Sequence, residues 1–288
     1  MGNAYQTTMY ILKKYNITAN KSLGQNFLIN DDVISKTIDS ANISKEDLII
    51  EIGPGLGTLT EGLLEKAGKV IAIELDKRML SILKERFSLY SNFEVINDDV
   101  LKVDLQDLIK NEKKMNNLKV AKIVANLPYY ITTPIIMKLL EDKLDIETIT
   151  VMVQKEVAKR LTAKPGEKLA GAITYSVNYY CNAEEMVEVP RESFIPAPEV
   201  ESEVIKLKLR ETKPVELENE KEFFKLIKNS FMQRRKTFLN GVSNSGLVDK
   251  EKLKQILKEM NINENVRGEN LTLEQFAEIS NRICTNAK

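Results

Sequence analysis

IIEIGPGLGTLT, residues 49–60, joins an apolar run, a glycine turn and a segment that can form a helix. Residues 48–52 are apolar apart from Glu51 and stop at a Gly-Pro-Gly breaker, which predicts a short buried strand. Glycines at every second position from Gly53 to Gly57 allow a sharp bend and a close approach to a ligand, and a helix from about Thr58 points its N–H groups there. The stretch is therefore either an ordinary strand-to-helix turn or a ligand-binding loop.

The next strand favours the ligand-binding loop. Residues 69–75 form a second apolar run, and its end carries Glu74, about 20 positions after Gly53. At this distance a strand-helix-strand unit places an acidic side chain beside a ribose. A nucleoside cofactor is the leading ligand.

The glycine spacing separates two classes of nucleoside cofactor. Dinucleotide-binding enzymes carry G-x-G-x-x-G, whereas this chain has G-x-G-x-G at Gly53, Gly55 and Gly57, two positions after Glu51. This pattern resembles the first motif of S-adenosylmethionine-dependent methyltransferases. With no pyrophosphate to hold, the turn is free to lie against the methionine and ribose parts of that cofactor.

Composition limits the classes of protein that the chain can be. Its 288 residues are 43% hydrophobic and 29% charged, which is typical of a soluble globular protein with one or two domains. The 42 basic and 42 acidic residues cancel, so any affinity for nucleic acid must come from local patches. No signal-peptide pattern and no apolar run of about 18 residues is present. We expect a cytosolic protein.

Cysteine and histidine usage restricts the chemistry. Cys181 and Cys284 are far apart and form neither a disulfide framework nor a zinc motif, which indicates a reducing compartment. The chain has no histidine, so histidine-based triads and histidine-containing metal sites are excluded. We expect no metal, and chemistry that works without imidazole.

Strand and helix patterns alternate from Leu48 onward, which predicts an α/β fold with mostly parallel strands and helices on both faces. Six strands are expected, and a further strand pair is plausible across 172–180 and 183–190. The six are residues 48–52, 69–74, 93–97, 121–125, 148–153 and 203–209. A polar, proline-containing segment at 210–220 predicts a domain boundary, and apolar residues at helical spacing predict that residues 211–288 form a small all-helical domain.

Several polar residues stand just past, or at, the ends of the expected strands. In a parallel sheet these ends share one rim, so Gly53, Glu74, Asp99 and Asn126 should lie close together. Asp98 and Asp99 are either a solvated turn or an acceptor for the amino group of adenine, a role for which Asp99 is better placed.

Asn126-Leu127-Pro128-Tyr129 is the most specific motif in the chain, although a turn followed by a core tyrosine has the same pattern. An adenine N6 is a poor nucleophile because its lone pair is delocalised into the ring, and acceptors for both of its N–H groups improve it. The Asn126 side-chain oxygen and the Leu127 carbonyl can be those acceptors. Pro128 fixes the turn and has no N–H, and Tyr129 offers a ring for a flipped base.

Two later segments carry further candidates. Phe194 opens the proline-stiffened run FIPAPEVES, residues 194–202, and either stacks on a base or plugs the core. Arg234-Arg235-Lys236 is the densest part of a stretch, residues 223–248, with five bases and no acid. These three residues are either scaffold, paired with acids nearby in sequence, or the best candidate for a phosphate-binding patch.

Taken together, the motifs resemble the ribosomal RNA adenine N6-dimethyltransferases, most closely the small-subunit (16S) branch. The resemblance covers nearly the whole chain and rests on motifs that fall in the family's order. They are Gln25-Asn26-Phe27-Leu28, residues 51–57, Glu74, Asp99, residues 126–129, Phe194-x-Pro-x-Pro-x-Val-x-Ser202 and Gln233-Arg234-Arg235-Lys236-Thr237.

The resemblance implies a fold, a reaction and a set of site residues. It implies a Rossmann-like S-adenosylmethionine-dependent methyltransferase domain over residues 1–210 and a helical rRNA-binding domain over 211–288. Tyr129 and Phe194 are expected beside the target base. The expected cofactor site is lined by Asn26, Leu28, Gly53, Glu74, Asp99 and Asn126.

The implied function is methyl transfer from S-adenosylmethionine to N6 of two adjacent adenines in a small-subunit rRNA loop, twice per adenine, by a protein expected to be a monomer. A large-subunit rRNA methylase of the erythromycin-resistance type is an alternative, and so is a non-catalytic ribosome-assembly factor on the same fold. Asp98, Tyr130 and Ala170 depart from the family pattern, which more often has Gly, Asn and Tyr at these positions.

Overall fold

The computed structural model describes residues 3–20, 23–233 and 235–285. The chain divides into two compact units. The first contains residues 1–158 and 183–209, and the second contains residues 159–182 and 210–288. No helix in the described ranges is both long enough and apolar enough to cross a membrane.

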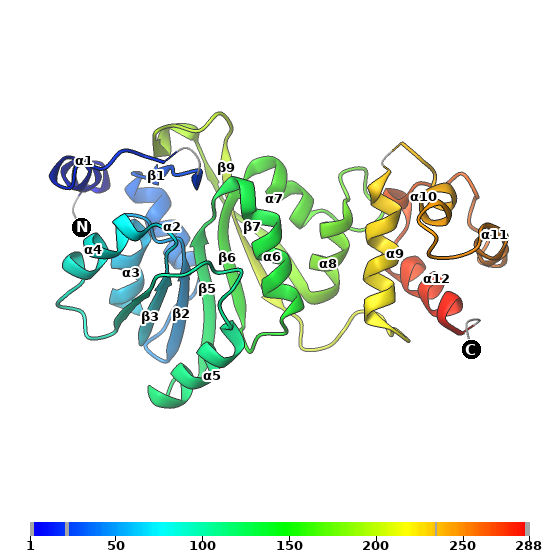
Figure 1. Cartoon of the computed structure of the whole chain (residues 1–288), viewed down its shortest axis with the longest axis horizontal. Helices are drawn as coiled ribbons and strands as arrows, with labels where there is room; N and C mark the ends of the chain where they lie inside the picture. Colours follow the sequence, from blue (N-terminus) through cyan, green and yellow to red (C-terminus); the bar gives the residue numbers. More distant parts are fainter. Residues whose placement is uncertain (1–2, 21–22, 234, 286–288) are drawn as a thin grey trace. The chain divides into compact units, whose positions relative to one another are not determined.

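A seven-stranded sheet organises the first unit, with strand order β4-β3-β2-β5-β6-β9-β7. Neighbouring strands from β4 to β6 pair in parallel, and β9 is antiparallel to β6. Figure 1 shows β3, β2, β5 and β6 side by side in this order. The strands are β2 (Asp47–Ile52), β3 (Lys69–Ile73), β4 (Phe93–Ile96), β5 (Val120–Asn126), β6 (Thr148–Gln154), β7 (Cys181–Val189) and β9 (Ser202–Leu209). The predicted α/β class with a mostly parallel sheet is confirmed.

The order of the strands creates a switch point between β2 and β5. The chain runs from β2 outward to β4, then returns to β5 on the other side of β2. Since such crossovers are right-handed, the first two helices cover one face and the next two cover the other. They are α3 (Thr58–Lys66) and α4 (Lys77–Arg86), then α5 (Leu105–Met115) and α6 (Thr132–Glu141). Ligands bind where the strand order reverses, outside the carboxyl ends of the strands.

The N-terminal segment lies against this sheet. Helix α1 (Ala4–Lys14) precedes α2 (Asp31–Ser40), and Asn30 caps α2 by accepting from the N–H groups of Asp32 and Val33 at 3.1 and 3.3 Å. Between the two helices, β1 (Phe27–Leu28) pairs antiparallel with β8 (Phe194–Ile195). The sequence alone did not indicate this two-residue ladder, because so short a strand has no periodicity.

The second unit is helical. Its core gathers aromatic and aliphatic side chains from α8 (Ala172–Tyr180), α9 (Glu220–Met232), α10 (Phe238–Asn244), α11 (Lys250–Glu259) and α12 (Leu273–Thr285). Helix α7 (Lys155–Thr162) spans the division between the units. Short 3-10 turns cover residues 129–131, 191–193 and 268–270.

Residues 172–180 correct one prediction, since they form helix α8 and not a strand. Their Ile, Thr, Tyr and Val residues favour strands locally, but Tyr175 and Tyr179 lie one helical turn apart and are both fully buried in the second unit's core. Tertiary packing therefore overrides the local propensity. The partner strand expected at 183–190 does form, as β7.

The segment that contains α8 belongs to the second unit, although it precedes the predicted domain boundary in the sequence. The second unit resumes at Arg210, close to the expected position, yet it also contains residues 159–182. The Tyr175 hydroxyl donates to the carbonyls of Gly268 at 3.0 Å and Leu271 at 2.6 Å, and its ring lies 4.8 Å from Phe276. These contacts attach the segment to the C-terminal helices.

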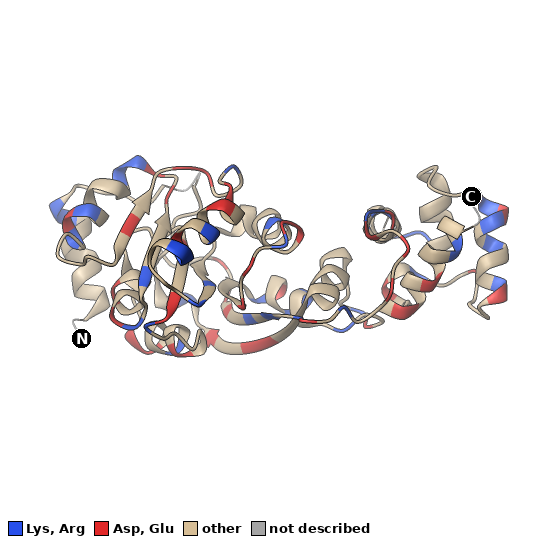
Figure 2. Cartoon of the chain, turned by 90° about the horizontal axis from the view of Figure 1, so that it is seen from below, with Lys and Arg blue, Asp and Glu red and all other residues tan. Residues whose placement is uncertain are grey.

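Charges are mixed in both units. Figure 2 shows basic and acidic segments interspersed along the ribbon, in keeping with equal numbers of the two kinds. Any interaction with a polyanion must therefore rest on a few local residues.

Candidate functional site

The carboxyl ends of β2, β3 and β5 border an open pocket in the first unit. This position matches that of small-molecule sites in α/β proteins. Every expected cofactor residue lines it, as do Leu127, Pro128 and Tyr129. The expected cofactor residues are Asn26, Leu28, Gly53, Glu74, Asp99 and Asn126.

The glycine turn contributes two kinds of glycine. Gly53 and Gly55 line the pocket with φ angles of 66° and 57°, which only glycine adopts readily. Gly57 has a φ of 82° but does not line the pocket. A Cβ atom there would lie 2.5 Å from Cε2 of Phe87. The third glycine is thus required by packing against α4, and not by a ligand as its spacing suggested.

Glu74 places a buried carboxylate at the pocket. It is 6% exposed, and its two oxygens accept from the backbone N–H groups of Asp76 at 2.8 Å and Gly55 at 3.1 Å. Burial raises the pKa of the Glu74 carboxyl, and these two N–H groups oppose the rise. Each oxygen keeps a lone pair for a ligand hydroxyl.

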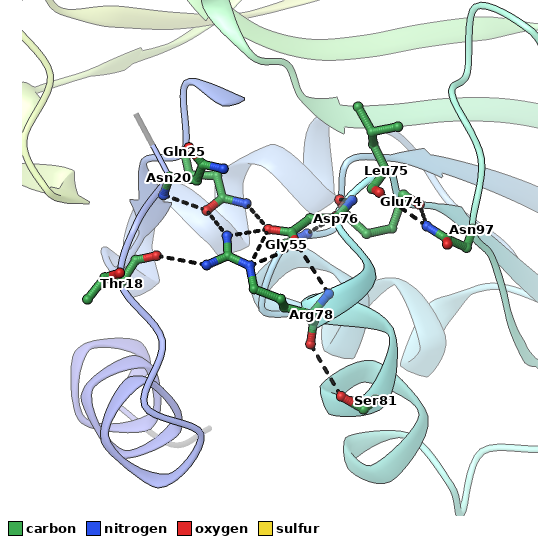
Figure 3. Close-up of polar contacts among 10 residues, drawn as sticks. All are labelled: Thr18, Asn20, Gln25, Gly55, Glu74, Leu75, Asp76, Arg78, Ser81 and Asn97. Atoms are coloured by element: carbon green, nitrogen blue, oxygen red, sulfur yellow. Dashed lines mark hydrogen bonds and ion pairs between the residues drawn. The ribbon is translucent and has the colours of Figure 1, made fainter. Parts of the chain in front are cut away.

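A polar network ties the N-terminal segment to Glu74 (Figure 3). Asp76 accepts from Nε2 of Gln25 at 2.9 Å and from Nε of Arg78 at 3.0 Å, and the Gln25 oxygen accepts from the N–H of Asn20 at 2.8 Å. The Arg78 guanidinium lowers the pKa of the Asp76 carboxyl, which keeps it charged. The network therefore holds the segment that carries Asn26 and Leu28 beside the strand end that carries Glu74.

Asp98 and Asp99 line the pocket after β4. The Asp98 carboxylate accepts from the N–H of Asp99 at 2.7 Å, and Oδ1 of Asp99 accepts from the N–H of Leu101 at 3.0 Å. The two acids thus form a turn and also border the pocket. The Asp99 carboxylate keeps acceptor capacity for a ligand on both of its oxygens.

Asn126, Leu127, Pro128 and Tyr129 continue from β5 along the pocket wall. Leu127 is anchored by its N–H, which donates to the carbonyl of Met152 at 3.1 Å. Nδ2 of Asn126 faces the carbonyl of Asn26 at 3.5 Å. Within the described ranges no hydrogen bond is made to Oδ1 of Asn126 or to the Leu127 carbonyl. Two neighbouring oxygens are therefore available to accept hydrogen bonds from a ligand.

Tyr129 is half-buried and fixed at its tip. Its hydroxyl lies 2.6 Å from Oγ of Ser202, at the start of β9. Burial raises the pKa of the Tyr129 hydroxyl, which keeps the phenol neutral. The backbone therefore holds one end of the Tyr129 side chain at the pocket, and the contact with Ser202 holds its hydroxyl.

Phe194 is placed differently from the expectation that it flanks a base. It lies in β8 opposite Leu28, is 3% exposed and belongs to the apolar core of the first unit. It is not among the residues that line the pocket. The structure favours the alternative reading of Phe194 as a core residue.

Glu51 is a pocket residue whose role the sequence left open. It is 1% exposed and accepts from Oγ1 of Thr60 at 2.6 Å. Burial raises the pKa of the Glu51 carboxyl to about 8. A cationic ligand in the pocket would favour the ionised form.

The basic segment lies in the second unit. Arg234 is outside the described residues. Arg235 and Lys236 are exposed and follow the end of α9 in a turn. Thr237 then caps α10 by accepting from the N–H of Asn240 at 3.3 Å.

Several lining residues were not predicted to reach the pocket. Leu75 is 48% exposed directly after Glu74, and Tyr130 is 54% exposed directly after Tyr129. Their places next to strand ends were the available signal. Further examples are Phe27, Val100, Ile131 and Ile135. No group of acidic or cysteine side chains able to hold a metal occurs in the described residues.

The fold and the pocket define a class. The sheet is mostly parallel and has a glycine turn at its switch point, an acidic residue after the next strand and two unoccupied hydrogen-bond acceptors after β5. This is the arrangement of a Rossmann-like S-adenosylmethionine-dependent methyltransferase. Comparison with known proteins gives the family. The sequence model described as "Ribosomal RNA adenine dimethylase" matches residues 16–285, and the chain belongs to this family.

Curated relatives match along nearly the whole chain. A protein of Clostridioides difficile named "Ribosomal RNA small subunit methyltransferase A" is 49% identical over 283 residues, covering 98% of this chain and 97% of the relative. A protein of the same name from Alkaliphilus oremlandii is 48% identical, covering 96% of each chain.

Solved structures agree on the fold. A dimethyladenosine transferase from Plasmodium falciparum superposes with a TM-score of 0.72 at 30% identity, covering 88% of this chain and 95% of the other. The 23S rRNA methyltransferase ErmE superposes with a TM-score of 0.68 at 24% identity, covering 90% of this chain and all of the other. The second likeness concerns the fold alone.

Proposed function

We propose that this protein transfers methyl groups from S-adenosylmethionine to N6 of two adjacent adenines in a small-subunit (16S) rRNA loop, giving N6,N6-dimethyladenosines during ribosome maturation. The observation that supports this proposal most directly is that two groups of residues line the same pocket. Glu74 and Asp99 suit a nucleoside cofactor, and Asn126 to Tyr129 suit an exocyclic amine. The curated relatives' name, at 48 to 49% identity, supports the small-subunit substrate.

The pocket fits the proposed cofactor. Gly53 and Gly55 present backbone with no side chain, which leaves room for the methionine part. Glu74 can accept from the ribose hydroxyls and Asp99 from the adenine amino group, while Asn26 and Leu28 complete the wall. The buried Glu51 carboxyl suits a ligand with a positive charge. When bound, the cofactor supplies an activated methyl group on a sulfonium.

The acceptor side of the pocket fits an adenine amine. Oδ1 of Asn126 and the Leu127 carbonyl can accept from both N–H groups of N6, which lets the nitrogen become more tetrahedral and localises its lone pair. Pro128 brings no competing N–H, and the Tyr129 ring offers a face to the flipped base. Positioning and these acceptors replace a strong base, because the alkylated nitrogen is acidic enough to lose its proton to solvent.

The remaining expectations follow from this reading. We place the enzyme in the cytoplasm as a monomer without a metal, with small-subunit rRNA in a ribosomal subunit or its precursor as partner. Residues 211–288, with Arg234, Arg235 and Lys236, form the proposed rRNA-binding domain. An erythromycin-resistance type of activity remains the alternative, since ErmE shares the fold, and a binding-only assembly role is the other.

The experiment uses small subunits from cells that lack the protein, with the methylated nucleotides mapped afterwards. The wild-type enzyme should dimethylate two adjacent small-subunit adenines and leave large-subunit rRNA unmodified. Asn126→Ala should lower the rate at least about 100-fold, because it removes one of the acceptors, while circular dichroism shows a folded protein.

Asn116→Ala is the matched control. Asn116 is the C-cap residue of α5, its Nδ2 donates to Glu112, and it does not line the pocket, so its variant should retain the wild-type rate. An Asn126→Ala variant that works at near the wild-type rate contradicts the mechanism. Methylation of large-subunit rRNA in place of small-subunit rRNA overturns the substrate assignment.

A further inference from the structure

Tyr130 is an exposed aromatic residue at the pocket with no role in the reaction described above. It belongs to the 3-10 turn Tyr129–Ile131, lines the pocket and is 54% exposed. Its neighbour Tyr129 is half-buried and tethered to Ser202, whereas Tyr130 keeps most of its side chain open to solvent. The rings of Tyr129 and Tyr130 therefore differ in their surroundings, although the two residues are consecutive.

The Tyr130 ring is supported by the N-terminal segment. A Cβ atom on Gly24 would lie 3.3 Å from Cδ1 and 3.7 Å from Cε1 of Tyr130, so the glycine backbone packs close against the ring. Gly24 has a φ angle of 59°, and its carbonyl accepts from Nδ2 of Asn26 at 3.2 Å. The next residue, Gln25, is fixed by Asp76 at 2.9 Å. The Tyr130 ring thus packs against a backbone that is itself held in place, while more than half of the residue stays exposed.

The other aromatic residues that line the pocket or were expected there are less exposed. Phe194, expected beside the base, is 3% exposed in the core, and Phe27 lines the pocket with only 6% of its surface exposed. Tyr129 is committed to the target base in the proposed function. Among the aromatic side chains that line the pocket, Tyr130 alone is more than half exposed.

We propose that Tyr130 is a stacking platform for the adenine next to the target adenine. The inference rests on the proposed function, in which two adjacent adenines are modified. Extrusion of one base removes a stacking partner from its neighbour, and an exposed ring one residue along from the target-base ring restores it. A base has a π-face whatever its identity, so the platform contributes to RNA affinity without distinguishing one base from another.

The test compares three variants of Tyr130 on small subunits that carry unmethylated adenines. Tyr130→Phe keeps the ring and should retain kcat/KM within about twofold. Tyr130→Leu keeps apolar bulk against Gly24 without a π-face, and Tyr130→Ala removes both. The last two should lower kcat/KM between about fivefold and about 150-fold, mainly through KM for the subunit. Calorimetric affinity for S-adenosylmethionine should be unchanged in all three.

Tyr10→Leu is the matched control, because Tyr10 is 64% exposed on α1 and does not line the pocket. It should behave as wild type. Full activity of Tyr130→Leu reduces Tyr130 to packing against Gly24, and a parallel loss of cofactor affinity assigns it to the cofactor; either result overturns the proposal. If the wild-type enzyme leaves the subunits unmethylated, the proposed function fails and this inference falls with it. If only the role proposed for Tyr130 is wrong, the wild type and the Tyr130 variants methylate the subunits equally well.

Discussion

The buried Glu51 side chain makes the stability of the folded protein depend on pH. Its carboxyl is enclosed by the sheet and has Thr60 as hydrogen-bond donor, and burial raises its pKa from the ordinary 4.5 to about 8. The folded protein therefore binds this proton more tightly than the unfolded chain does. Stability from Glu51 is fully present below pH 4.5 and is lost as the pH rises toward 8.

Glu51→Gln should remove this pH dependence, because a glutamine amide has the shape of the neutral acid and can accept from Thr60. Between pH 6 and pH 8 the free energy of unfolding of the wild type should fall by about 2 kcal/mol relative to the variant. Urea denaturation of both proteins at the two pH values measures the difference. Parallel curves for the two proteins would show that Glu51 is ionised throughout this range.

At the scale of secondary structure, the end of α4 clamps the glycine turn. Arg86 donates through Nη1 to the Leu56 carbonyl and through Nη2 to Glu61 at 2.9 Å. Phe87, the residue that caps α4, presses its ring against Gly57. The turn that carries Gly53 and Gly55 to the pocket is thus held from behind by an element about 30 residues further along the chain.

Gly57→Ala should destabilise the first unit by about 2 to 5 kcal/mol. The new Cβ atom would meet Phe87 at 2.5 Å, and the φ angle of 82° adds the left-handed backbone penalty. Thermal or chemical unfolding followed by circular dichroism measures the loss.

Gly53→Ala is the control for the backbone term. Gly53 also has a positive φ, but its nearest neighbour to a new Cβ is the Asn126 carbonyl at 4.0 Å, so about 1 to 2 kcal/mol is expected. Equal losses for the two variants would mean that Phe87 yields without cost and that packing does not select glycine at position 57.

On the scale of the whole molecule, balanced charge makes local patches decisive. Arg235 and Lys236 are exposed in the turn between α9 and α10, inside a stretch with no acidic residue. Counterions released from RNA by such side chains give binding a steep dependence on salt.

Arg235→Ala combined with Lys236→Ala should weaken small-subunit binding and reduce the slope of log affinity against log salt by about two, one for each lost phosphate contact. Binding measured at several salt concentrations gives the slope, and cofactor affinity should stay unchanged.

Lys250→Ala combined with Lys258→Ala is the charge-matched control. Both lysines are exposed on α11, so the pair changes the net charge equally and should leave the slope near that of wild type. An unaltered slope for the Arg235 and Lys236 pair, or unfolding of that variant, would assign these residues to holding the helical unit together.

The sequence by itself determined the sheet and most of the pocket. Local patterns sufficed because an apolar run that ends in a glycine or polar turn specifies a buried strand and its functional end together. Parallel strands then bring these ends to one rim, so Gly53, Glu74, Asp99 and Asn126 met as expected.

Only the tertiary structure decided which aromatic residues reach the pocket and where residues 159–182 belong. Phe194 and Tyr130 differ by burial, which depends on partners distant in sequence: Phe194 pairs with Leu28, and Tyr130 rests on Gly24. The helical state of residues 172–180 depends likewise on the contacts that Tyr175 makes with Leu271 and Phe276. At these residues side-chain burial is set by long-range packing, which the local sequence pattern does not specify.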